Sequence, residues 1–168
     1  QRQMCIRDRF QTSSQSYLDM TFEAIKRFGS SLPHGEDWVR NTGGLHKPKA
    51  VDITLEPDAS AACFFWAAAA ITGGSIEVEG LGLQSKQGDV EFVFLLENMG
   101  CDIAETDRGI AVKGPASGEL CGIEVDLNHM PDAAPALSAV ALFAKGRTEI
   151  KNVAHLRFKE SDRISDWR

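Results

Sequence analysis

The chain has 168 residues, 43% of them hydrophobic, and a formal net charge of −6 at pH 7. This length accommodates one complete domain or parts of two, and the apolar fraction is that of a folded globular protein. The acidic excess disfavours non-specific binding to nucleic acid. The longest apolar run, AACFFWAAAAI at 61–71, is shorter than the roughly 18 residues that a membrane span needs. We therefore expect neither nucleic acid nor a membrane as a partner.

The cysteines, at positions 5, 63, 101 and 121, show neither the spacing of metal ligands nor the density of a disulfide-stabilised fold. Some of them lie inside or beside apolar segments. This usage is typical of a reducing compartment. We therefore expect a cytoplasmic protein that needs no metal and no cofactor.

Both ends of the chain are unusual. The segment QRQMCIRDR has no helix or strand period and no signal-peptide pattern, and it resembles a translated sequencing adapter. We therefore interpret residues 1–9 as non-native. The chain stops at KESDRISDWR, inside a predicted helix and without a C-cap signal. These features predict an internal fragment of a longer protein.

The first predicted elements are a helix and short strands. YLDMTFEAIKRFG, residues 17–29, places its apolar side chains at helical spacing and ends at Gly29. Residues 30–49 are polar and glycine-containing, which favours short strands joined by turns. AVDITLEP, residues 50–57, alternates as a strand does.

A repeated pattern follows. EPDASAACFFWAAAAITGGSIEVEG and MPDAAPALSAVALFAKGRTEIKNV each contain Pro-Asp-Ala, an apolar helix, a glycine and an alternating strand. Pro57 and Pro131 are 74 residues apart, and so are Ile76 and Ile150. Three short predicted strands, CDIAET, GIAVKG and GIEVDLNH, lie between the copies. The duplication predicts an α/β chain built from repeated units, with helices on one side of mixed sheets.

The aspartates of the two Pro-Asp-Ala motifs, Asp58 and Asp132, stand at predicted helix starts. A carboxylate there can cap free N–H groups and interact favourably with the helix dipole. We expect Asp58 only to cap. Capping alone would explain Asp132 as well, so a chemical role for it stays open at this point.

The stretch HLRFKESDRI, residues 155–164, concentrates cations in an acidic chain. If a helix begins near Lys159, then Lys159 and Arg163 lie four residues apart on one face of its first turn. Such a place would hold a phosphate or a carboxylate. Glu160 is a candidate proton carrier if that anion raises its pKa. An ordinary surface helix with salt bridges explains the spacing equally well.

Several motifs resemble those of the EPSP synthase family: EPDASAACFFWAAAAITGG, QGD, MGC, NHMPDAAPALSAVALFAKG and, above all, HLRFKESDRI. The resemblance extends from about Ser14 to the end of the chain. Family members fold as two similar domains built from repeated βαββαβ units. The resemblance therefore implies an α/β enolpyruvyl transferase fold. It makes residues 10–55 the C-terminal remnant of one domain and residues 56–168 the truncated first part of the other.

The resemblance also implies an activity. The family transfers the enolpyruvyl group of phosphoenolpyruvate to the 5-hydroxyl of shikimate 3-phosphate and releases phosphate, in the pathway to chorismate. Asp132 matches the carboxylate that accepts the hydroxyl proton, and Glu160 the residue that exchanges protons with the methylene carbon of phosphoenolpyruvate. Lys159 matches a ligand of shikimate 3-phosphate that also neutralises developing charge. Arg163 matches a ligand of the anionic groups of phosphoenolpyruvate, which suits a guanidinium fork.

Other matches concern substrate binding. Ser14 and Tyr17 match residues that line the phosphate and ring of shikimate 3-phosphate. The Ser-Ser-Gln triplet at 13–15 precedes a predicted helix, where the family's phosphate-binding triplet does not belong, so we interpret that likeness as accidental. His155 occupies a position where family members carry asparagine or histidine, and it joins the substrate-binding candidates.

Alternatives remain beside the EPSP synthase activity. The related transferase that acts on UDP-N-acetylglucosamine shares the fold and chemistry, but its site does not use KESDR. A non-catalytic fragment that binds shikimate 3-phosphate weakly, or pairs with another half, would carry the same motifs. Because much of the family's site lies outside the chain, we expect the chain alone to be inactive. We expect the full-length enzyme to act as a monomer on its two small-molecule substrates.

Overall fold

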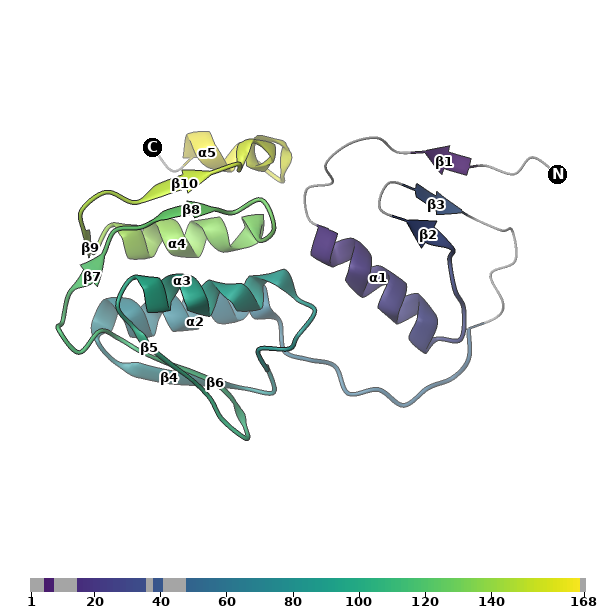
Figure 1. Ribbon diagram of the computed structural model, residues 1–168, viewed down its shortest axis with the longest axis horizontal. Helices are drawn as coiled ribbons and strands as arrows, with labels where there is room; N and C mark the ends of the chain where they lie inside the picture. Colours follow the sequence, from purple (N-terminus) through teal and green to yellow (C-terminus); the bar gives the residue numbers. More distant parts are fainter. Residues whose placement is uncertain (1–4, 8–14, 36–37, 41–47, 167–168) are drawn as a thin grey trace. The chain divides into compact units, whose positions relative to one another are not determined.

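The computed structural model describes residues 5–7, 15–35, 38–40 and 48–166 (Figure 1). The chain divides into two compact units, Gln1–Leu55 and Glu56–Arg168. The division falls between the same two residues as the predicted domain boundary. That the units belong to two similar domains stays a prediction. No helix of the described residues is long and apolar enough to cross a membrane.

The described residues of the first unit form one helix and a small sheet. Helix α1, Gln15–Arg27, confirms the predicted helix. The sheet has the antiparallel order β1-β3-β2, with β1 at Cys5–Arg7, β2 at His34–Gly35 and β3 at Trp38–Arg40. Strands β2 and β3 confirm the short strands predicted after the helix. Strand β1 lies within residues 1–9, where the sequence shows no strand period, and the interpretation of this segment as non-native stays a prediction.

The predicted strand at 50–57 was wrong. Residues 48–58 form neither helix nor strand, and Val51, Ile53 and Leu55 are exposed. A strand is stabilised by hydrogen bonds to a neighbouring strand and by burial of one face. Alternation alone therefore predicted an element that lacks such a neighbour among the described residues.

The second unit begins with helix α2, Ala59–Thr72, as the repeat predicts. Asp58 is its N-cap, and the Asp58 carboxylate accepts a hydrogen bond from the backbone N–H of Ser60 at 2.9 Å. Gly73 ends the helix in the left-handed conformation, with φ of 70°, which glycine adopts without steric cost. The capping role predicted for Asp58 is confirmed.

Asp58→Ala is expected to lower the free energy of unfolding by about 1 kcal/mol, because Ala accepts no hydrogen bond from the first turn of α2. Asp58→Asn retains an accepting oxygen and is expected to stay within about 0.5 kcal/mol of the parent chain. Urea unfolding of both variants measures the difference. An equal loss in both would mean that the negative charge, and not the cap, stabilises the helix.

A three-stranded antiparallel sheet packs against α2. Its order is β4-β6-β5, with β4 at Ser75–Glu79, β5 at Asp102–Glu105 and β6 at Gly109–Lys113. These strands confirm three of the predicted ones. Trp66 of α2 is fully buried, and its indole N–H donates to the carbonyl of Ile110 at 3.3 Å. The apolar helix thus buries its large aromatic residue without leaving the indole N–H unsatisfied.

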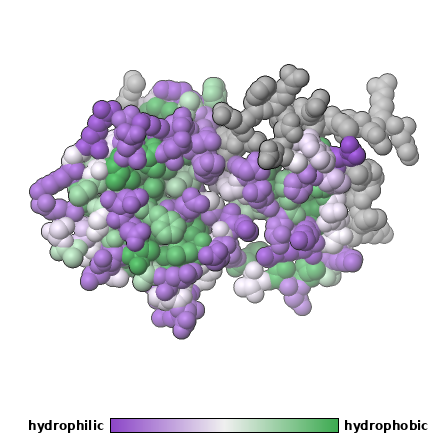
Figure 2. Space-filling model, in the orientation of Figure 1, coloured by the Kyte–Doolittle hydropathy of each residue, from purple (hydrophilic) through white to green (hydrophobic). Residues whose placement is uncertain are grey.

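Helix α3, Phe92–Asn98, follows the 3₁₀ turn η1, Gly88–Glu91. The buried core of the unit comes from α2, α3, helix α4 (Ala134–Ala141) and the inner faces of the strands. In Figure 1 the three helices lie between the β4-β6-β5 sheet and the later strands. Hydrophobic residues also reach the surface over these helices (Figure 2). The exposed large apolar side chains of the helices and the turn after α4 are Phe64, Phe65, Phe94, Leu142 and Phe143.

Helix α4 is a crossover between parallel strands. Strand β7 (Leu120–Cys121) pairs with β9 (Ala144–Lys145), and β8 (Glu124–Asp126) pairs with β10 (Glu149–Lys151), both in parallel. Parallel neighbours need such a crossover, and their carboxyl ends meet at one edge. Parallel and antiparallel pairs thus occupy separate sheets instead of the predicted mixed sheets. The segments that follow β8 and β10 must start side by side.

Candidate active site

Asp132 lies in the turn that follows β8. It is part of the 3₁₀ helix η2, Pro131–Ala133, which leads into α4. The N-cap of η2 is Met130, and neither η2 nor α4 has a side-chain capping hydrogen bond. The capping interpretation of Asp132 was therefore wrong, although the same local sequence does cap at Asp58.

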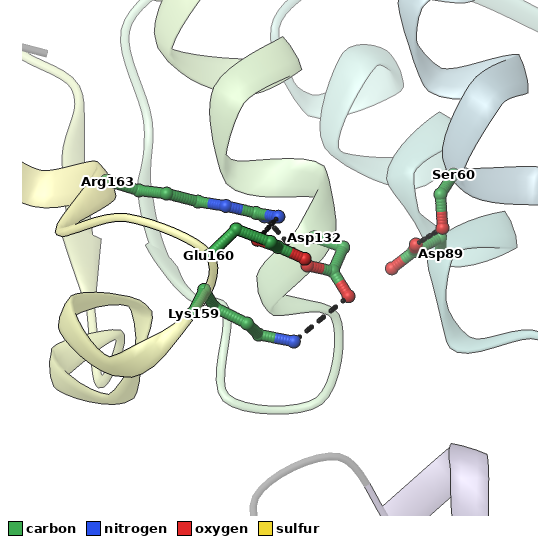
Figure 3. A network of polar contacts seen from close by, with 6 residues as sticks. All are labelled: Ser60, Asp89, Asp132, Lys159, Glu160 and Arg163. Carbon is green, nitrogen blue, oxygen red and sulfur yellow. Dashed lines mark hydrogen bonds and ion pairs between the residues drawn. The ribbon is translucent and has the colours of Figure 1, made fainter. Parts of the chain in front are cut away.

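Two cations contact the Asp132 carboxylate instead (Figure 3). Arg163 Nη1 donates to Asp132 Oδ1 at 2.9 Å, and Lys159 Nζ lies 3.4 Å from Asp132 Oδ2. All three side chains are partly buried, with 20% of Asp132, 24% of Arg163 and 29% of Lys159 exposed. Ion pairs at such burial are less screened than surface pairs and hold a defined geometry.

The predicted helix beginning near Lys159 was wrong. Residues Ala154–Phe158 form the 3₁₀ helix η3, Lys159 is extended, and helix α5 starts only at Arg163. Asp162 determines this start, because its carboxylate accepts from the backbone N–H of Ser165 at 3.1 Å. Lys159 and Arg163 therefore meet at Asp132 through a loop and not along one helix face.

Arg157 stabilises this loop through two hydrogen bonds. Its Nη1 donates to Asp162 Oδ2 at 2.8 Å and to Ser165 Oγ at 3.1 Å. These contacts tie η3 to the first turn of α5, and Lys159 and Glu160 lie in the connection between them. The connection that carries Lys159 and Glu160 is thus fixed between η3 and α5 at both of its ends.

Glu160 is paired with the outer side of the guanidinium. Arg163 Nη2 donates to Glu160 Oε2 at 2.6 Å, and 78% of the Glu160 side chain is exposed. A hydrogen bond with its own backbone N–H and the bond from Arg163 lower the pKa of Glu160. The lowered pKa of Glu160 is opposite in direction to the raised pKa that we predicted for Glu160 beside a bound anion. Glu160 is therefore ionised at neutral pH in this arrangement.

A second pair of side chains joins the strands below the site. Asn152, which directly follows β10, donates from Nδ2 to Asp126 Oδ2 at 2.5 Å, and Asp126 is the last residue of β8. Asp126 Oδ1 also accepts from the backbone N–H of Asn128 at 2.8 Å. The backbone hydrogen bond from Asn128, followed by the one from Asn152, lowers the pKa of Asp126. The carboxyl ends of both strands are thereby held together where the site begins.

Asp89 is a residue of this region that reasoning from the sequence missed. It lies in η1 with 3% of its surface exposed, and Ser60 Oγ donates to its Oδ2. Burial, above all, raises the pKa of Asp89, and the charge of Asp132 raises it further. The signal in the sequence was the QGD motif, noted only for its resemblance.

The other predicted binding residues lie in separate elements of the chain. Tyr17 lies in α1 of the first unit, with 39% of its surface exposed. Ser14 lies outside the described residues. His155 lies in η3, half-buried, and its Nε2 atom is buried without a hydrogen-bond partner among the described residues. A buried ring nitrogen normally has a partner, so His155 is a candidate ligand contact.

The chemistry of the site follows from these contacts. A partly buried carboxylate beside two cations can accept a proton, while the cations bind phosphate or carboxylate groups. No group of His, Cys, Asp and Glu side chains suited to a metal ion occurs within the described residues.

Comparison with known proteins decides the family. Residues 6–167 match the family EPSP synthase (3-phosphoshikimate 1-carboxyvinyltransferase). The chain belongs to the EPSP synthase family. The 3-phosphoshikimate 1-carboxyvinyltransferase 2 of Nicotiana tabacum is 43% identical over 155 residues, which cover 88% of this chain and 46% of that protein. The chloroplastic enzyme of Arabidopsis thaliana is 44% identical over 158 residues, 90% of this chain and 30% of that protein.

Solved structures agree with this EPSP synthase assignment. An EPSP synthase from Acinetobacter baumannii aligns with a TM-score of 0.67 and 31% identity, covering 85% of this chain and 34% of that one. The enolpyruvyl transferase NikO from Streptomyces tendae aligns with a TM-score of 0.59 at 22% identity, over 79% of this chain and 32% of that one, which shows the fold. The enolpyruvyl transferase fold is confirmed. The chain spans less than half the length of these relatives.

Proposed function

We propose that the full-length protein carrying this sequence transfers the enolpyruvyl group of phosphoenolpyruvate to the 5-hydroxyl of shikimate 3-phosphate and releases phosphate. The observation that carries the proposal is the convergence of Lys159 and Arg163 on Asp132 in a family member. Both substrates are multiply charged anions, and cations beside a carboxylate base suit them.

In this proposal Asp132 accepts the proton of the attacking hydroxyl. Lys159 binds the phosphate of shikimate 3-phosphate and stabilises the negative charge that develops beside Asp132. Arg163 binds an anionic group of phosphoenolpyruvate with its planar fork. His155 contacts shikimate 3-phosphate, which would give its buried Nε2 atom a partner. Tyr17 and Ser14 line the same substrate.

Binding of the substrate anion would change the protonation of Glu160. A carboxylate or phosphate group competes with Glu160 for the Arg163 guanidinium, which now donates to Glu160 at 2.6 Å. Losing this partner and gaining a neighbouring anion would both raise the pKa of Glu160. Glu160 could then carry a proton to the methylene carbon, the role that the resemblance implies.

The proposal includes a cytoplasmic location and a monomeric state. Among the described residues, Cys63, Cys101 and Cys121 are free thiols, which agrees with a reducing compartment. Some plant relatives carry the word chloroplastic in their names.

The test of the function is phosphate release. We expect the full-length protein to release phosphate when both substrates are present and to release none when either is omitted. The 168-residue chain alone is expected to release none, since it spans less than half of each relative and a catalytic site needs all of its groups in position. Turnover with UDP-N-acetylglucosamine in place of shikimate 3-phosphate would contradict the proposed substrate.

A further inference from the structure

The buried carboxylate of Asp89 has no place in the proposed reaction. Asp89 is the only charged or polar residue that is buried among the described residues, with 3% of its surface exposed. An ionised carboxylate is costly to bury unless it is hydrogen-bonded or paired. Ser60 Oγ donates to one of its oxygens, and the N-terminus of α2 is favourable for negative charge. These contacts explain how Asp89 is tolerated but not what it does.

The fold places Asp89 and Asp132 in two turns that pack against the same helix. Asp89 lies in η1 and Asp132 in η2, and both 3₁₀ turns contact α2. Figure 3 shows one carboxylate oxygen of Asp89 at Ser60 and the other directed toward Asp132. The charges of Asp132 and Lys159 both act on Asp89. In Figure 3 Asp89 lies on one side of Asp132, and Arg163 and Glu160 lie on the other.

We infer that Asp89 is a positioning residue, held by Ser60, whose buried negative charge makes Asp132 a stronger proton acceptor. The inference rests on the proposed function of Asp132 as the base. Two neighbouring carboxylates repel each other when both are ionised. Each therefore binds a proton more readily than it would alone. Lys159 and Arg163 act in the opposite direction, and Asp89 offsets part of their effect.

Charged and titratable groups from several elements packed around Asp89 act on it. Asp58 precedes α2, Cys63 lies within α2, Asp132 lies in η2 and Lys159 follows η3. Cys63 stays a neutral thiol, because burial, first of all, raises its pKa far above the physiological range. Asp58 is exposed and acts on Asp89 less strongly than Asp132 does. Asp58→Asn, like Asp132→Asn, removes one negative charge that acts on Asp89, but it leaves Asp132 unchanged. It is therefore the matched control.

The first experiment measures the coupling without any turnover. Carboxyl ¹³C signals of the aspartates in the 168-residue chain are titrated by NMR in the parent, Asp132→Asn and Asp58→Asn chains. We expect Asp132→Asn to shift the titration midpoint of Asp89 to lower pH, and to do so more than Asp58→Asn. Reciprocally, Asp89→Asn should shift the midpoint of Asp132 to lower pH. An Asp89 midpoint that is the same in the Asp132→Asn and parent chains would overturn the inference, and this holds even if Asp89→Asn does not fold.

The second experiment links the coupling to function. In the full-length protein, Asp89→Asn is expected to shift the acid limb of kcat/KM against pH to lower pH, while Asp58→Asn leaves the limb in place. If Asp89 only clamps α2 through Ser60, its variant changes stability and leaves the limb unmoved, which would overturn the inference. A parent protein without phosphate release would refute the proposed function, and the NMR titration would still decide the coupling.

Discussion

Asp132→Asn is expected to lower the turnover number of the full-length protein by a factor on the order of 10² to 10⁴, because the amide is isosteric but accepts no proton. Asp132 holds Arg163 at 2.9 Å and Lys159 at 3.4 Å. Its loss therefore also leaves two partly buried cations facing each other. Steady-state phosphate release measures the loss of turnover.

The control for this variant is Asp58→Asn. Both aspartates follow proline and precede alanine, but Asp58 caps α2, whereas η2 and α4 begin without a side-chain capping hydrogen bond. We expect turnover of Asp58→Asn to stay within about twofold of the parent. A loss of less than about tenfold for Asp132→Asn, or an equal loss for both variants, would mean that Asp132 is not the base.

Arg163→Lys is expected to lower kcat/KM by roughly 10- to 100-fold, about the effect of losing one hydrogen bond to a charged group. Arg163 donates to Asp132 from Nη1 and to Glu160 from Nη2. A lysine ammonium is a single point and does not reproduce the fork, although the charge stays. Kinetics with phosphoenolpyruvate varied separate binding from chemistry. We expect KM for this substrate to carry much of the change.

Arg157→Lys is the matched control for Arg163→Lys. Arg157 lies in the same segment and also uses its guanidinium to hold two oxygens, those of Asp162 and Ser165, but it does not contact Asp132 in the described contacts. Its side chain is 42% exposed, so loss of its geometry is expected to change kcat/KM by less than about threefold. If both variants lower kcat/KM equally, the activity depends on the conformation of the loop and not on the guanidinium fork of Arg163.

Much of the second unit followed from the sequence alone. The 74-residue repeat located α2 and β4, and then the region of α4 and β10. Local chemistry was enough to predict the helix there, because its hydrogen bonds lie within the segment and Asp58 and Gly73 mark its two ends. The alternating segment at 50–57 followed the same reasoning and was wrong. A strand depends on its neighbour, and alternation does not say whether one is present.

The site required the tertiary structure. Identical Pro-Asp-Ala sequences gave a cap at Asp58 and an ion-paired carboxylate at Asp132. The difference arises because the segment after β10 runs beside η2, and β8 and β10 are parallel neighbours with their carboxyl ends at one edge.

The sequence by itself determined which residue types the KESDR segment offers, and the motifs indicated the family. Only the fold decided that Lys159 and Arg163 meet at Asp132 through a loop, and that the buried Asp89 lies close enough to feel the charge of Asp132. The physical reason is that electrostatic interactions depend on distance and burial in space, and neither follows from separation along the chain.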